Sequence, residues 1–97
     1  MKIEHLHELC ETIAAIKNRT EVQLLLKDLL SPKELESVVE RLQIVKMLHQ
    51  RIPQREISAQ LGVSIAKITR GSKALKRSSG GFSRYVWQRK RPSNPWR

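Results

Sequence analysis

Apolar residues recur at intervals of three or four along most of the chain, the spacing that places them on one face of an α-helix. This pattern predicts helices over residues 3–16, 22–30 and 32–50, and no segment shows the strict alternation of a surface strand. Ser31-Pro32-Lys33-Glu34 provides a capping serine, a proline suited to the first helical position and a glutamate that completes a capping box. Asn18 and Thr20 are expected to interrupt the chain between the first two helices. The sequence therefore predicts an all-α protein.

The segment from Gln54 to Lys76, QREISAQLGVSIAKITRGSKALK, has the pattern of two short helices joined by a tight turn. Gly62 suits the turn because it accepts a positive φ, and Ser64 suits the N-cap of the second helix. The buried positions expected around this turn are Ile57, Leu61, Val63, Ile65, Ile68 and Leu75. The pattern is typical of a helix-turn-helix, whose second helix enters the DNA major groove with its first residues toward the base edges. The exposed residues expected there are Ser64, Ala66, Lys67 and Thr69.

The charge of the chain is concentrated in its second half. Residues 1–50 contain seven Lys/Arg and eight Asp/Glu, whereas residues 51–97 contain twelve Lys/Arg and a single acid, Glu56. Phosphate binding favours such a concentration because each neutralised phosphate releases condensed counterions. The same charge would also suit a highly soluble protein with a basic tail, but here the helix-turn-helix pattern lies within the basic half.

Length and composition limit the architecture further. Ninety-seven residues form one small domain, and with four aromatic residues its core must be built from Leu, Ile and Val. Because so short a set of amphipathic helices buries little surface alone, we expect a dimer. The single cysteine fits a reducing cytoplasm, no apolar run approaches a membrane span, and the acidic start does not resemble a signal peptide.

Catalytic and metal sites are not expected. The sequence contains no nucleophile–base pair, paired carboxylates or phosphate-binding glycine loop, so we do not expect an enzyme. His5 and His7 lie on different faces of the first helix, and with Cys10 they lack a second ligand pair, so no metal site is predicted.

Two strings in this chain, LSPKELESVVERLQIVKML and IPQREISAQLGVSIAKITRGSKALK, resemble the tryptophan repressor family. The most specific part is Ile68-Thr69-Arg70-Gly71-Ser72. The resemblance covers about residues 30–76 and implies a six-helix subunit, an intertwined homodimer and free L-tryptophan as corepressor. It implies one domain over residues 1–91, with a dimerisation core over 1–50, a DNA-reading head over 53–76 and a last short helix over 82–91. The basic tail, residues 92–97, has two prolines and is expected to be disordered.

The resemblance also implies roles for individual residues. The indole would lie between the guanidinium groups of Arg41 and Arg70, an arrangement favoured by cation–π attraction. The effector-binding residues that it implies are Arg41, Arg70, Gly71, Ser31, Asp28, Leu30 and Val45. The DNA-binding residues that it implies are Gln54, Arg55, Ser58, Ser64, Ile65, Ala66, Lys67, Thr69, Ser72, Lys73 and Lys76.

Several departures from the family leave alternatives open. Ala74 replaces a serine near the polar end of the ligand, and Lys67 replaces a threonine, so its ammonium could meet the ligand carboxylate, a base or a phosphate. Ser31 is fully explained as a helix cap, and Arg41 could be ordinary helix-surface charge.

The function favoured is tryptophan-dependent repression at palindromic operators of tryptophan-related genes. The alternatives are a ligand-independent helix-turn-helix DNA-binding protein and a basic RNA-binding protein, for which aromatic platforms would be expected.

Overall fold

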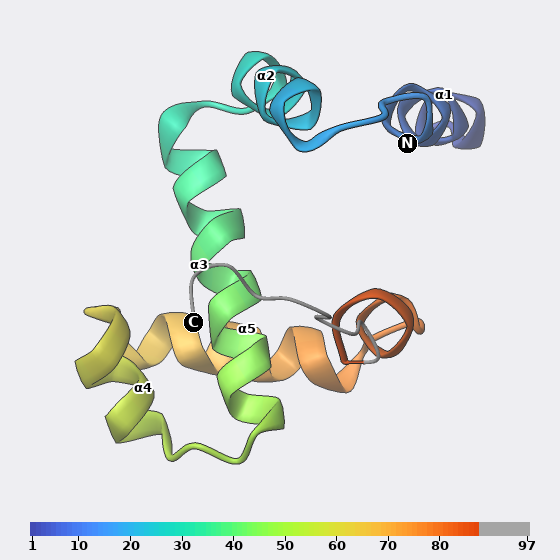
Figure 1. Ribbon diagram of the computed structural model, residues 1–97. Helices are drawn as coiled ribbons and strands as arrows, with labels where there is room; N and C mark the ends of the chain where they lie inside the picture. The colour runs from blue at the N-terminus through green and yellow to red at the C-terminus, as the bar shows by residue number, and fades with distance from the viewer. Residues whose placement is uncertain (88–97) are drawn as a thin grey trace. The chain divides into compact units, whose positions relative to one another are not determined.

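The computed structural model describes residues 1–87, and all regular secondary structure in this part of the chain is helical, which confirms the predicted fold class (Figure 1). The helices in chain order are α1 (Ile3–Ala14), α2 (Arg19–Leu29), α3 (Pro32–His49), α4 (Gln54–Leu61), α5 (Ile65–Lys76) and the π-helix η1 (Ser83–Trp87). The predicted last helix over residues 82–91 is described only as far as Trp87. The predicted tail lies outside the described residues.

The boundary between α1 and α2 differs from the sequence prediction. Helix α1 ends at Ala14, and α2 begins at Arg19, three residues before the expected start. Asn18 does not merely interrupt the pattern: its side chain accepts a hydrogen bond from the backbone N–H of Glu21 at 3.0 Å and so caps α2. Amide side chains at this position satisfy one of the free donors at the helix start.

The start of α3 is the capping box that the sequence predicted. The backbone N–H of Ser31 donates to the Glu34 carboxylate at 2.8 Å, and the Glu34 N–H donates to the Ser31 hydroxyl at 3.2 Å. These reciprocal bonds satisfy two backbone donors that the helix leaves free. The Ser31 N–H, followed by its hydroxyl, lowers the pKa of Glu34 below the ordinary value of 4.5.

Helix α3 ends at a left-handed residue that is not glycine. Arg51 takes a left-handed conformation with φ 65°, and the backbone N–H groups of Arg51 and Ile52 donate to the carbonyls of Leu48 and Met47 at 2.9 and 3.1 Å. This pair of bonds is a Schellman motif, and Ile52 and Met47 both pack against the hydrophobic core, as such motifs commonly require. The motif turns the chain sharply toward α4.

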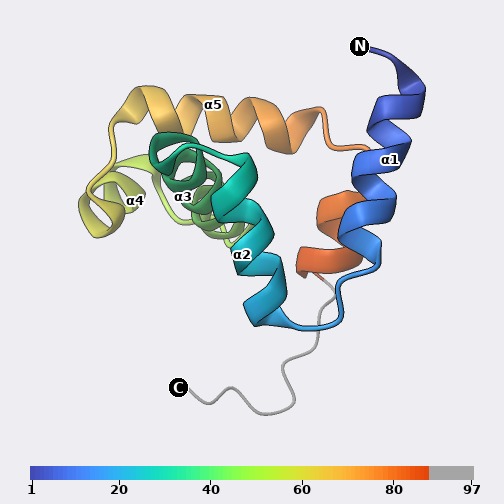
Figure 2. The same cartoon turned by 90° about the horizontal axis from the view of Figure 1, so that it is seen from above.

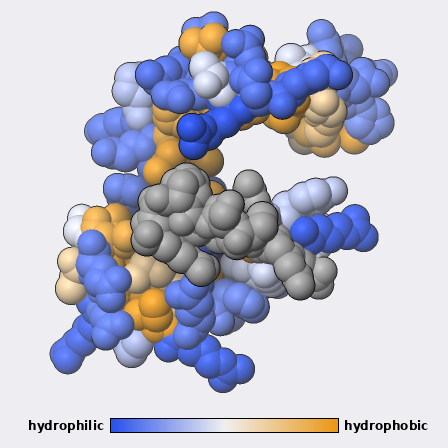
Figure 3. Space-filling model, viewed as in Figure 1, coloured by the Kyte–Doolittle hydropathy of each residue, from blue (hydrophilic) through white to orange (hydrophobic). Residues whose placement is uncertain are grey.

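The chain divides into two compact units, residues 1–37 and residues 38–97. In the first unit, neither α1 nor α2 contains a buried residue. Large apolar side chains of these helices are instead exposed, and Figure 3 shows hydrophobic surface among them. The exposed members are Ile3, Leu9, Ile13, Leu24 and Leu29. This unit has no interior of its own within the single chain.

The second unit contains the hydrophobic core. Its buried members come from α3, α4, the following turn and α5, and half-buried apolar residues pack around them. The buried set is Ile44, Ile57, Val63 and Ile68, with Met47, Leu48, Ile52 and Leu61 around it. Figures 1 and 2 show the second half of α3 crossing α5, with α4 beside the start of α5. The core therefore fixes α5 on two other helices.

Helix η1 is attached to the end of α3 by aromatic contacts. The rings of His49 and Trp87 stack with centroids 3.9 Å apart and planes within 1° of parallel. Phe82 meets Trp87 at 5.6 Å in a tilted arrangement. No local sequence pattern predicts this stack, because it joins the end of α3 to a residue far along the chain.

The capping box makes α3 sensitive to acid. Because the folded pKa of Glu34 is depressed, its stabilisation is present above the unfolded value and is lost as pH falls through the folded pKa. We expect the Ser31 amide chemical shift, followed by NMR, to titrate with a midpoint below 4.5. Glu34→Gln keeps an acceptor oxygen but should abolish this titration. A Ser31 amide that does not respond to acid in the wild type would contradict the capping box.

Candidate nucleic-acid interface and effector pocket

The turn between α4 and α5 has the geometry that the sequence predicted for a helix-turn-helix. Gly62 is left-handed, with φ 67° and ψ 33°, and its N–H donates to the Ser58 carbonyl at 2.9 Å. Val63 is buried and packs into the core. The Ser58 hydroxyl, a predicted DNA contact, donates to the Val63 carbonyl at 2.7 Å, so in this structure it stabilises the turn.

Helix α5 begins with a side-chain cap, as predicted. The Ser64 hydroxyl accepts a hydrogen bond from the backbone N–H of Lys67 at 3.2 Å. Ile68 is fully buried, but the prediction that Ile65 lies on the buried side was wrong, because that side chain is 47% exposed. At 3.6 residues per turn the inner face of α5 is formed by Ile68, Gly71 and Ala74, and Ile65 falls at its edge.

Glycine occupies the middle of this inner face because α5 approaches α3 closely there. A Cβ added to Gly71 would lie 2.5 Å from Ile44 Cγ2 and 3.4 Å from Ile44 Cβ. Glycine at this mid-helix position therefore has a packing reason that involves no ligand. The contact with the indole that the family resemblance implies for Gly71 stays a prediction.

The predicted DNA-binding residues are mostly accessible. Ser58, Lys67 and Ser72 are half-buried, and the others are exposed, namely Gln54, Arg55, Ser64, Ile65, Ala66, Thr69, Lys73 and Lys76. The Thr69 hydroxyl donates to the Ile65 carbonyl at 3.1 Å, a bond within the helix that leaves an oxygen lone pair free. The exposed start of α5, with basic side chains farther along it, is the surface that a helix-turn-helix presents to DNA.

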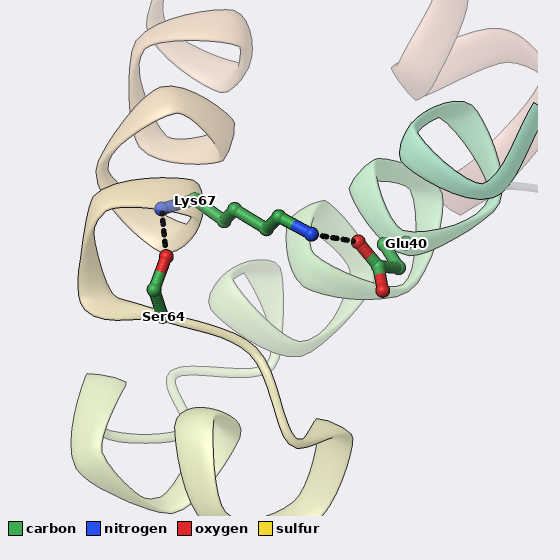
Figure 4. A network of polar contacts seen from close by, with 3 residues as sticks. All are labelled: Glu40, Ser64 and Lys67. Carbon is green, nitrogen blue, oxygen red and sulfur yellow. Dashed lines mark hydrogen bonds and ion pairs between the residues drawn. The ribbon is translucent and has the colours of Figure 1, made fainter. Parts of the chain in front are cut away.

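Lys67 has a partner that the sequence did not indicate. Its ammonium lies 2.8 Å from Glu40 Oε1 on α3, a residue 27 positions earlier (Figure 4). The sequence left a ligand carboxylate, a base or a phosphate as possible partners, and none of these is Glu40. No local spacing could reveal the pair, because it depends on how α3 and α5 cross.

A cavity lies beside the first of the two predicted effector arginines. It is widely open to solvent and has a volume of about 500 Å³. Its lining residues are Arg41, Ala74, Arg77, Ser78, Ser79, Gly81 and Phe82. The lining thus combines two arginines and two serines with one aromatic residue, a set of residue types suited to a ligand with a carboxylate and an apolar body.

The remaining predicted effector residues are distributed differently. Arg70 is exposed and Val45 is fully buried in the second unit, and neither is among the residues lining the cavity. Ser31, Asp28 and Leu30 belong to the first unit. The lining residues Arg77 and Phe82 were not predicted, since they follow the end of α5, where the sequence indicated only a basic loop and a further helix.

Other kinds of site are not evident among the described residues. Within residues 1–87, no group of three or more His, Cys, Asp or Glu side chains is arranged to hold a metal ion. In the same part of the chain, every helix is too short or too polar to cross a membrane.

The chain is similar to known proteins of a single family. Residues 4–90 match the family described as Trp repressor protein. A Trp operon repressor homolog of Mannheimia succiniciproducens is 46% identical over 77 residues, 78% of this chain and 76% of the relative. Homologs of the same name from Actinobacillus succinogenes and Pasteurella multocida are each 39% identical over 85 residues, covering 87% of this chain and 84% and 83% of the relatives. No solved structure matches the chain significantly.

The turn and cap geometry define a helix-turn-helix protein. The extent of the match shows that the chain belongs to the Trp repressor family, which is a family of DNA-binding regulators and not of enzymes.

The close approach at Gly71 can be tested by stability. Ile44 is buried and β-branched, so its methyl group cannot easily move away from an added Cβ. We expect Gly71→Ala to destabilise the protein by about 1–2 kcal/mol, because overpacking outweighs the helix propensity that alanine adds. Urea unfolding at matched protein concentration measures this. Gly81→Ala is the control, since a Cβ there meets nothing within 4 Å; equal stability of the two variants would contradict the close contact.

Proposed function

We propose that this protein is a tryptophan-dependent transcriptional repressor. It acts in the cytoplasm as a homodimer that binds palindromic operator DNA of tryptophan-related genes through α4 and α5 when L-tryptophan is bound. The observation that carries the proposal is the helix-turn-helix itself: a left-handed Gly62, a second helix capped by Ser64, and exposed residues at the start of that helix.

The distribution of charge supports DNA as the partner. The helix-turn-helix lies in the half of the chain that holds twelve Lys/Arg and one acid. Arg55, Lys73 and Lys76 are exposed on its two helices and are suited to phosphate contacts. Phosphate contacts position a protein on DNA, while the start of the second helix reads the bases, a docking geometry of which the Trp repressor is itself a known example.

The cavity beside Arg41 supports an amino-acid effector. A carboxylate pairs well with a guanidinium fork, and an indole stacks well on a guanidinium plane or packs against Phe82. The family and the names of the relatives favour L-tryptophan among such ligands. Bound beside the C-terminal end of α5, the ligand would affect the orientation of the helix that reads DNA.

The exposed apolar faces of α1 and α2 support the dimer. A unit without buried residues cannot be stable on hydrophobic burial within one chain, and extended apolar surfaces commonly mark interfaces. A second copy supplies the same apolar faces and places two reading heads about a two-fold axis. Two heads related in this way prefer a palindrome with half-sites about one helical turn apart.

The dimer makes an exposed leucine essential. Leu24 is 55% exposed in the single chain, so Leu24→Glu would be nearly harmless to a monomer. In a dimer we expect it to bury a charge and cause dissociation or unfolding. Sedimentation at micromolar concentration should give twice the chain mass of 11.3 kDa for the wild type and for the neighbouring control Gln23→Glu, but not for Leu24→Glu. A folded wild-type monomer would contradict the dimer and the two-headed operator.

Linkage tests the corepressor directly. If tryptophan raises operator affinity, operator DNA must raise tryptophan affinity by the same factor, typically about 5- to 150-fold. Calorimetric titration of tryptophan with and without operator should reveal this difference. We expect Arg41→Ala to abolish it while leaving weak, effector-independent DNA binding, and Arg41→Lys to restore it only partly, because an ammonium lacks the planar fork. Equal tryptophan affinities in the two wild-type titrations would refute the corepressor role.

A further inference from the structure

A single ion pair is found among the described side chains, and it connects the supporting helix α3 to the reading helix α5. Lys67 Nζ lies 2.8 Å from Glu40 Oε1, and the two side chains are 41% and 25% exposed (Figure 4). From the sequence, the Lys67 ammonium could meet the ligand carboxylate, a base or a phosphate. In this structure its charge is instead used within the protein.

The position of Lys67 gives the pair its importance. It is the third residue of α5, and its backbone N–H is held by the capping hydroxyl of Ser64 at 3.2 Å. The backbone is therefore fixed at the exposed start of the helix, beside Ala66, while the long side chain extends to α3. An unpaired lysine here would place a mobile ammonium among the residues that approach DNA.

We propose that Glu40 is a specificity-determining residue, which holds the Lys67 ammonium away from DNA phosphates and so limits sequence-independent binding. This inference rests on the proposed DNA-binding function. Lysine is a point charge on a flexible stem, and its ammonium can donate to a carboxylate or to a phosphate. A phosphate contact carries no sequence information, so its removal weakens binding to all DNA without loss of base reading.

The pair suits this role because it is close but partly exposed. Exposed ion pairs are weak, and the pair can open. Opening breaks the 2.8 Å contact and leaves the Glu40 carboxylate without its partner. The cost therefore falls on any complex in which Lys67 moves to a phosphate.

The salt dependence of binding to a non-operator duplex tests the proposal. Each phosphate contact adds about 0.9 to the slope of log affinity against log salt. We expect Glu40→Gln to steepen this slope by about 0.9 and to raise affinity roughly three- to tenfold near 0.1 M salt, because Lys67 is released. Lys67→Met should resemble the wild type, since its charge is already withheld. The double variant should resemble Lys67→Met.

Matched variants separate this effect from the simple loss of a negative charge. Glu36→Gln removes a carboxylate one turn earlier on α3, where the described residues provide no ion pair, and should not steepen the slope. Lys73→Met should itself flatten the slope, but Glu40→Gln added to Lys73→Met should steepen it by the same amount as Glu40→Gln added to the wild type. Circular dichroism melts establish that each variant is folded, and Lys67→Gln replaces Lys67→Met if the latter is not.

Two results would overturn the inference. If Glu40→Gln produces the same gain with Lys67 absent, or if Glu36→Gln produces it too, the effect is general electrostatics and Glu40 has no specific role. These outcomes leave the proposed function intact, because the wild type still binds duplex DNA. Failure of the wild type to bind any duplex, with or without tryptophan, would overturn the proposed function and this inference together.

Discussion

The close packing of α5 against α3 is the constraint on which the rest of the second unit depends. Gly71 lies so near Ile44 that no side chain fits between the two helices. This contact sets the depth at which Ile68 enters the core and leaves Ile57 and Val63 to close its other side. The core is small, so the orientation of the reading helix depends on a few side chains and is sensitive to single substitutions.

The same crossing produces the polar pair beside it. Glu40 is four residues before Ile44 on α3, and Lys67 is four residues before Gly71 on α5. Residues four apart lie on one face of a helix, so the ion pair lies about one turn from the point of closest contact on each helix. An apolar contact thus fixes the distance between the helices, and a charged contact next to it engages the Lys67 ammonium within the protein.

Local chemistry explains what the sequence could predict. The order of the helices, the capping box at Ser31 and Glu34, and the left-handed Gly62 all depend on signals a few residues long. Features without such a signal were missed or misread. Arg51 closes α3 in a conformation usually taken by glycine. Ile65 is apolar yet exposed because it falls at the edge of the inner face that Ile68, Gly71 and Ala74 form.

The candidate site likewise combines features set by local signals with features set by contacts between distant segments. The accessible start of α5 could be predicted from the turn and the cap, whereas the neutralised charge of Lys67 and the place of Phe82 in the cavity depend on contacts between distant segments. Arg41 directly follows Glu40 on α3, so one short stretch of that helix lines the cavity and also holds Lys67. A ligand that moved α3 relative to α5 would therefore change both the cavity and the ion pair. Effector binding and the availability of the Lys67 ammonium for DNA would then be coupled directly through the crossing of α3 and α5.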